Sequence, residues 1–138
     1  MASNARVVRR LALLAALAAL PVAGCGGGDD DVATGPEGPV TSLTITSTDL
    51  SFDIEAFEVP VGEEVTVTYE NEHERVPHNL HVDTGGPDEP TTEVVDGPVT
   101  QELTFTLDEA GEVPYVCDVH PATMRGTITA SEPGTAGA

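Results

Sequence analysis

Apolar and polar residues alternate along most of the chain between residues 41 and 130, and this period of two predicts β-strands. No long stretch has the 3.6-residue period of an amphipathic helix. Gly62, residues 85–87, residues 97–98 and Gly111 mark expected turns. The pattern predicts an all-β fold of about seven short strands, arranged as an antiparallel sandwich or a Greek-key barrel. The apolar members of the alternating stretches are Leu43, Ile45, Leu50, Phe52, Ile54, Val65, Val67, Tyr69, Leu103, Phe105, Leu107, Val113, Tyr115, Cys117 and Ile128.

The first 24 residues have the layout of an export signal. Arg6, Arg9 and Arg10 precede an apolar run at residues 11–23, which is shorter than the roughly 20 residues that a membrane span needs. The run ends in Val-Ala-Gly-Cys at residues 22–25, which resembles a bacterial lipobox, so we expect Cys25 to become the N-terminus and to carry a lipid. A plain signal peptide with a coincidental cysteine is the alternative. The arginine pair leaves open whether export follows the general secretory or the twin-arginine route.

The segments that flank the alternating region have little to bury. Residues 26–40 are rich in glycine, acidic residues and proline, and we expect them to be disordered and to span roughly 20–25 Å as a flexible coil. Residues 131–138 are expected to be a loose tail. The predicted organisation is therefore a lipoprotein-type signal peptide (1–24), a lipidated cysteine with an acidic linker (25–40), a folded domain (41–130) and a disordered tail (131–138).

The charge of the chain excludes one class of partner. It has 24 acidic and 5 basic residues, a net charge of −19, and three of its five arginines lie within the first ten residues. Nucleic-acid binding requires a cationic surface, so a nucleic-acid partner is excluded. A negative surface steers a cationic partner toward the protein, and it equally keeps a protein soluble in a salty medium. The composition does not decide between these two interpretations.

Two short stretches contain side chains that can bind a metal ion. Residues 115–126 contain Cys117, then His120 three residues later and Met124 four residues beyond it, while His78 lies 39 residues upstream of Cys117. A thiolate, two imidazoles and a thioether form the ligand set of a blue-copper electron-transfer site, which accepts both Cu(I) and Cu(II). Zinc could use the cysteine, the histidines and a water, but a thioether is not among the ligands that zinc sites use.

These stretches resemble the cupredoxins, the type 1 blue copper proteins such as plastocyanin, azurin and halocyanin. The resemblance covers residues 41–130. It rests on Pro-His-Asn at residues 77–79, on Cys-x-x-His-x-x-x-Met at residues 117–124 followed by Gly126, and on the lead-in at residues 57–65. It implies a cupredoxin-like Greek-key β-sandwich that holds one copper ion. His78, Cys117 and His120 would then be the equatorial ligands and Met124 the weak axial one.

The resemblance also assigns tasks to residues around the ion. Asn79 would hold the two ligand segments together by hydrogen bonds, which tunes the sulfur. Electrons would leave through the exposed imidazole of His120, ringed by Pro121, Ala122 and Pro77. The three residues between His120 and Met124 are an allowed length in the family and leave the subfamily undecided.

The other candidate residues have simpler interpretations. Cys117 could be an inert buried thiol, although an unoccupied thiol in an exported protein is open to oxidation. His81 would face the opposite side of a strand from His78, so we expect it to be solvated rather than a second ligand. His73 lies in the charged stretch at residues 71–75 and is expected to be a loop residue.

The leading hypothesis is a membrane-tethered type 1 copper protein that carries single electrons between redox proteins and is not an enzyme. Its partner would be a cytochrome or a membrane oxidoreductase with a basic docking face. We expect a monomer, exported and held by the lipid on Cys25 at the outer face of the cytoplasmic membrane, in the periplasm or at the cell surface. The alternatives are an extracytoplasmic copper chaperone or buffer, and a metal-free β-sandwich interaction module.

Overall fold

The computed structural model describes residues 32–134. The predicted signal peptide, Cys25, residues 26–31 of the linker and residues 135–138 of the tail therefore lie outside the described residues. The described part of the chain consists of strands, turns and loops, without a helix that could span a membrane. Its strands are β1 (Thr34–Pro39), β2 (Ser42–Asp49), β3 (Ser51–Phe52), β4 (Ala56–Pro60), β5 (Glu64–Asn71), β6 (Pro77–His78), β7 (His81–Val82), β8 (Val95–Asp96), β9 (Val99–Thr106), β10 (Gly111–Val116) and β11 (Arg125–Ser131).

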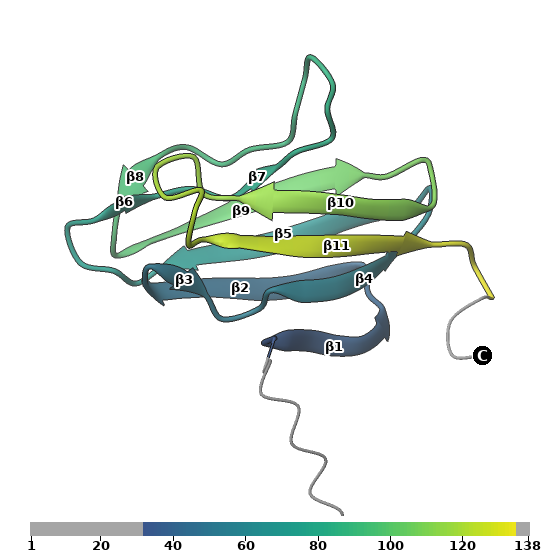
Figure 1. Cartoon of the computed structure of the whole chain (residues 1–138), viewed down its shortest axis with the longest axis horizontal. Helices are drawn as coiled ribbons and strands as arrows, with labels where there is room; N and C mark the ends of the chain where they lie inside the picture. Colours follow the sequence, from purple (N-terminus) through teal and green to yellow (C-terminus); the bar gives the residue numbers. More distant parts are fainter. Residues whose placement is uncertain (1–31, 135–138) are drawn as a thin grey trace, which may run out of the picture.

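The longer strands form two sheets that pack face to face (Figure 1). One sheet has the order β1-β4-β11-β10-β7, the other has the order β3-β2-β5-β9, and β6 and β8 form a separate two-stranded ribbon. The all-β sandwich predicted from the sequence is confirmed. Not every strand pair is antiparallel, because β2 runs parallel to β5 and β4 runs parallel to β11. In the chain, β4 lies between β2 and β5, but it belongs to the other sheet. A chain that crosses to the other sheet and then returns runs in its original direction again.

The core between the sheets contains the apolar residues of the alternating stretches. In β5, Val65, Val67 and Tyr69 are fully buried, while the residues between them are at least partly exposed. The Phe52 ring packs between Tyr69 and Tyr115, with centroid distances of 6.1 and 5.5 Å. Leu50 departs from the expected pattern and is 42% exposed, because it lies at the bend between β2 and β3 rather than within a strand.

The prediction of a disordered linker at residues 26–40 was wrong for the second half of this segment, because β1 lies there. β1 pairs in parallel with the edge of β4, and two further bonds from backbone N–H groups, Glu55 to Ala33 O (2.7 Å) and Val40 to Glu58 O (2.9 Å), extend this pairing. An open sheet edge offers hydrogen bonds to any backbone, whatever the side chains, so a composition poor in apolar residues does not prevent pairing. The predicted tail likewise begins inside a strand, because Ser131 is the last residue of β11 and pairs with Pro60.

Candidate metal centre

The predicted ligands come from two segments that meet at one end of the sandwich. His78 ends β6, and Cys117 directly follows the last residue of β10. The chain then makes a loop at residues 117–124 and returns as β11, so that Val116 pairs with Arg125 across the base of the loop. Figure 1 shows this loop beside β6 and β8. The strand pairing therefore brings together residues that are 39 positions apart in the chain.

The loop at residues 117–124, which we call the ligand loop, is held by its own backbone. The Cys117 N–H donates to Met124 O at 2.9 Å, and the Met124 N–H donates to His120 O at 2.9 Å. The His120 N–H donates back to Cys117 O at 3.2 Å. These bonds fix the three predicted ligands of the loop relative to one another.

The side chains of His78, Cys117 and His120 converge on one point. Cys117 Sγ lies 3.7 Å from His78 Nδ1 and 4.0 Å from His120 Nδ1, and the two Nδ1 atoms are 3.1 Å apart. His78 and Cys117 are fully buried, whereas His120 is half-buried. Met124, at the end of the ligand loop, is fully buried as well. Burial lowers the pKa of His78, and the neighbouring His120 and His73 lower it further, which keeps its imidazole neutral and able to donate a lone pair.

The separations fit a single metal ion. Transition metals bond to imidazole nitrogen and thiolate sulfur at about 2.0–2.3 Å, so ligand atoms around one ion lie roughly 3–4 Å apart. The three measured separations fall within this range. Two imidazoles and a soft thiolate, with a thioether at the end of the same loop, form the donor set that copper takes in type 1 sites.

The match to a family model decides the assignment. The model of copper-binding proteins of the plastocyanin/azurin family matches residues 39–131. The chain belongs to this family. The sandwich and the grouping of His78, Cys117, His120 and Met124 fit a cupredoxin with one type 1 copper ion, which is an electron-transfer type of copper protein. A comparison with curated protein sequences gives no match.

Solved structures support the same fold. Dithionite-reduced auracyanin from the photosynthetic bacterium Roseiflexus castenholzii is 23% identical, with a TM-score of 0.63 over 68% of this chain and 99% of that one. Auracyanin A, a blue copper protein from Chloroflexus aurantiacus, is 25% identical, with a TM-score of 0.56 over 68% of this chain and all of that one. The copper-containing nitrite reductase from Thermus scotoductus SA-01 is 29% identical, with a TM-score of 0.51 over 67% of this chain but only 23% of that one.

Asn79 links the two ligand-bearing segments of this cupredoxin. Its side-chain N–H groups donate to Asp118 Oδ2 at 2.7 Å and to Thr91 Oγ1 at 3.1 Å, and its Oδ1 accepts the Asp118 N–H at 2.8 Å. Asn79 follows His78 and Asp118 follows Cys117, so two of these bonds join the neighbours of two ligands. Rotation of either segment would break them.

His81 stays out of the metal cluster, but it is not simply solvated as the sequence suggested. Its side chain is only 20% exposed, and its ring nitrogens lie 2.8 Å from Asp118 Oδ1 and 2.6 Å from Glu89 Oε2. The hydrogen bond with Asp118 raises the pKa of His81, and the one with Glu89 raises it further, against the effect of burial. The spacing of His78 and His81 shows that they diverge, but no sequence pattern identifies the two carboxylates.

His73 is the residue that the sequence interpretation missed. It lies in a loop, as expected, but its Nδ1 is 3.0 Å from His78 Nε2, on the side of the ring away from the cysteine. The two ring centroids are 5.2 Å apart. The two histidines are five positions apart in an irregular segment, so no periodicity could have predicted the contact.

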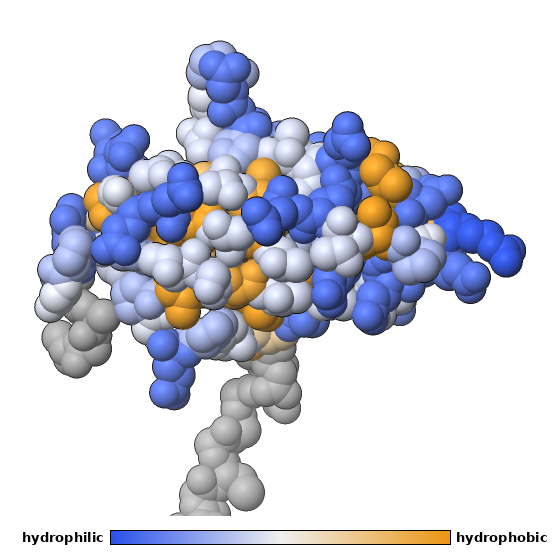
Figure 2. All heavy atoms as spheres, turned by 180° about the vertical axis from the view of Figure 1, so that it is seen from behind, coloured by the Kyte–Doolittle hydropathy of each residue, from blue (hydrophilic) through white to orange (hydrophobic). Residues whose placement is uncertain are grey.

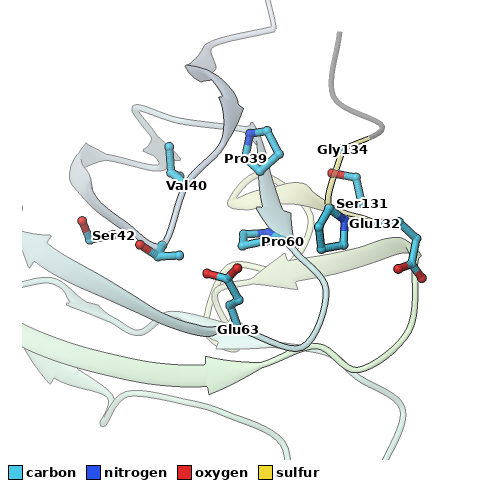
Figure 3. Close-up of a pocket in the computed structure, with 10 residues that line it drawn as sticks. Pro39, Val40, Ser42, Pro60, Glu63, Ser131, Glu132 and Gly134 are labelled. Atoms are coloured by element: carbon cyan, nitrogen blue, oxygen red, sulfur yellow. The ribbon is translucent and has the colours of Figure 1, made fainter. Parts of the chain in front are cut away.

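A separate hollow of about 550 Å³ lies at the other end of the sandwich. Figure 3 shows residues from the end of β1 and from Pro60 and Ser131 around it. β11 begins next to Met124 and ends at Ser131, and at about 3.3 Å per residue this separates the hollow from the metal centre by roughly 20 Å. The hollow therefore has no part in the metal site.

Proposed function

We propose that this cupredoxin carries single electrons between redox proteins while a lipid holds it at the outer face of the cytoplasmic membrane. The observation that carries the proposal is the convergence of His78, Cys117 and His120 on one point, with a single ligand reaching the surface. A bound copper ion would supply the one-electron Cu(II)/Cu(I) couple. The backbone bonds of the ligand loop and the Asn79 bonds keep the donor atoms in place, so that little rearrangement accompanies a change of charge.

A carrier is favoured over an enzyme because the protein itself can fill every ligand position. Metal catalysis needs an open position for water or substrate, and His78, Cys117, His120 and Met124 leave none. The similarity to nitrite reductase covers 67% of this chain but only 23% of that enzyme, so it extends over only a part of that enzyme.

His120 is the proposed route for the electron, and the patch around it is the proposed docking surface. Pro121 and Ala122 are exposed beside the half-buried His120, and Pro77 is half-buried. Val119, which the sequence analysis did not include, directly precedes His120 and is a further exposed apolar residue of the ligand loop, at 42% exposure. Residues 119–123 contain no charged side chain. An apolar patch around one exposed ligand allows a partner to approach without desolvating charges.

The net negative charge of the domain favours a partner with a basic face. On the face that Figure 2 shows, hydrophilic residues lie mainly around the edge, and apolar residues lie among residues of intermediate hydropathy in the middle. Arg75 and Arg125, the two arginines among residues 32–134, lie in or directly after the segments that bear the ligands, together with Glu72, Glu74 and Asp118, and the other acidic residues are spread over the rest of the sequence. We propose a cytochrome or membrane oxidoreductase whose cationic rim meets this acidic surface.

The position of β1 determines how a lipid on Cys25 would place the domain. Thr34 pairs with Ala56, and Ala56 pairs with Thr127, near the start of β11. β1 therefore begins in the half of the sandwich that is nearer the ligand loop (Figure 1). The nine residue steps from Cys25 to Thr34 span at most about 30–32 Å. A lipid on Cys25 would thus keep the copper end of the domain close to the bilayer, within reach of a partner in the membrane.

The test uses the two cysteines as matched variants. Addition of Cu(II) to the purified protein is expected to give an intense blue or green thiolate-to-copper absorption that disappears on one-electron reduction and returns on oxidation. Cys117→Ser should abolish this absorption. Cys25→Ser should leave it unchanged but move the expressed protein from the membrane fraction to the soluble fraction. Copper binding without this absorption would contradict the proposal, and release of copper to a chelator within minutes would favour a copper-transfer function instead.

A further inference from the structure

We propose that His73 is a positioning residue of the copper centre, one that accepts a hydrogen bond from the ligand His78 and thereby increases the donor strength of that ligand. The proposal rests on the copper centre itself and not on the electron-carrier function. The two can therefore fail independently.

The contact has a defined direction. The His78 Nδ1 atom faces Cys117 Sγ and His120 Nδ1 and must offer its lone pair to the metal. A neutral imidazole that uses Nδ1 as a ligand carries its proton on Nε2. That nitrogen lies 3.0 Å from His73 Nδ1, so the Nε2–H of His78 donates and His73 accepts. His78 is fully buried, and among the hydrogen bonds of the described residues this is the one that its Nε2 makes.

The loop that carries His73 holds the backbone of this residue in place. The fully buried Asn71 accepts the His73 N–H through Oδ1 at 3.0 Å and donates through Nδ2 to Val76 O and Val95 O at 2.9 and 3.0 Å. The Val76 N–H also donates to His73 O at 3.2 Å. Gly97 packs so closely that a Cβ atom there would lie 2.6 Å from His73 O. The position of His73 is thus fixed from three sides.

An acceptor at Nε2 changes what His78 does for the metal. It fixes the orientation of the ring and withdraws the Nε2 proton slightly, which makes the Nδ1 lone pair more basic. A more basic ligand stabilises Cu(II) more than Cu(I), because the higher charge gains more from the added electron density. His73 therefore lowers the reduction potential. If His73 only filled space, a ring of the same size without an acceptor would serve equally well.

The experiment compares three substitutions on copper-loaded protein. His73→Phe keeps a ring but removes the acceptor, and His73→Asn places an amide oxygen near the position of Nδ1. Glu74→Gln is the matched control, because the Glu74 side chain is 75% exposed in the same loop and its one ion pair is with Arg75. Loss of an outer hydrogen-bond partner typically weakens metal binding 10–100-fold. If the substitution weakens the binding of Cu(II) and not that of Cu(I), each tenfold loss of Cu(II) affinity raises the midpoint potential by 59 mV.

We expect voltammetry to show a midpoint potential that is at least 59 mV higher in His73→Phe than in the wild type. The rise should be smaller in His73→Asn, and the potential of Glu74→Gln should be unchanged. In the diamagnetic Cu(I) protein, the NMR signal of the His78 Nε2 proton should be visible in the wild type and in His73→Asn but broadened by exchange in His73→Phe. Equal potentials in His73→Phe and Glu74→Gln, or equal shifts in His73→Phe and His73→Asn, would overturn the proposal. Should His73→Phe fail to fold, His73→Leu removes the acceptor with a smaller side chain and is judged by the same outcomes.

Discussion

The two segments that meet at the copper centre are held in different ways. The ligand loop at residues 117–124 contributes three of the four predicted ligands, and its own backbone hydrogen bonds give it its shape. The segment at residues 71–79 contributes only His78, and it is held by side chains, mainly Asn71 and Asn79, that bond to other parts of the chain. The shape of the ligand loop therefore depends on its local sequence, whereas the shape of residues 71–79 depends on contacts with the rest of the fold.

The most damaging single substitution is expected on the side of the ligand loop. A Cβ atom at Gly126 would lie 2.2 Å from Cζ of the fully buried Tyr115, whose hydroxyl donates to Ile54 O. Gly126→Ala must displace this ring and break its hydrogen bond. Overpacking costs about 1–3 kcal/mol, and a buried group that loses its partner costs about as much again. We therefore expect a loss of about 2–6 kcal/mol in the free energy of unfolding, measured by urea denaturation.

Gly86→Ala is the control for this substitution, because the nearest atom to a Cβ there is 3.7 Å away and its unfolding free energy should change little. Combining Gly126→Ala with Tyr115→Leu should recover part of the loss, because the ring that clashes is gone. A Gly126→Ala protein as stable as Gly86→Ala would show that β11 can shift away, and that the base of the ligand loop is less constrained than its contacts indicate.

The Asn71→Ala substitution tests the segment at residues 71–79, which is held by hydrogen bonds to other parts of the chain. It leaves the Val76 and Val95 carbonyls and the His73 N–H without their partner in a buried site, so a loss of about 2–3 kcal/mol is expected. Gln101→Ala removes a similar side-chain amide that bonds to the backbone of Glu93, but at an exposed site where water can replace it, and should cost less than about 1 kcal/mol. Both values can be read from denaturation midpoints.

The comparison of the two segments also predicts a spectroscopic difference for Asn71→Ala. Cys117 belongs to the self-supporting loop, so the thiolate-to-copper absorption of the variant should persist while its copper affinity falls. Complete loss of the absorption together with the stability would mean that the ligand loop also depends on Asn71, and the distinction between the segments would then fail.

The same distinction explains how far the sequence could predict this molecule. The alternation in β5 and β9 predicted the buried faces because a strand buries every second residue, and the spacing of Cys117, His120 and Met124 revealed the ligand loop because all three lie close together in the chain. β1 could not be predicted, since its pairing depends on the open edge of β4 and not on its own composition. The roles of His73 and of the carboxylate partners of His81 were missed because these contacts form only in the folded chain and produce no periodic pattern in the sequence.

The smallest predicted effect concerns the link between the two segments. His81 bonds to Asp118, Asp118 bonds to Asn79, and Asn79 follows His78, so this chain of contacts connects the ligand loop to β7 and β6. Glu89 faces the other nitrogen of the His81 ring, and Asp83 in turn faces Glu89. The strength of the link should depend on pH because His81 and its carboxylate partners are charged over only part of the pH range.

The folded-state pKa of His81 is raised above its ordinary value of 6.5 by the hydrogen bond with Asp118, so its contribution to stability is full below about pH 6.5 and is lost as the pH rises through the raised pKa. Burial tends to raise the pKa of Asp118, but hydrogen bonds with His81 and Asn79 outweigh it and hold the pKa below 3.8. The hydrogen bond with His81 lowers the pKa of Glu89 below 4.5. The carboxylates therefore lose their contribution to stability only at lower pH, as the pH falls through their lowered pKa values. The network should stabilise the protein most between about pH 4.5 and 6.5.

Copper-loaded protein is the right material for the measurement, because wild type and His81→Asn then have the same occupied metal centre. Partly exposed ion pairs contribute up to about 1 kcal/mol, so wild type should lose no more than that in unfolding free energy between pH 6 and pH 8.5 relative to His81→Asn. Urea denaturation of both proteins at several pH values gives this difference directly. Parallel pH profiles for wild type and His81→Asn would show that the ion pairs at His81 add nothing, and that Asn79 alone joins the ligand loop to the segment that bears His78.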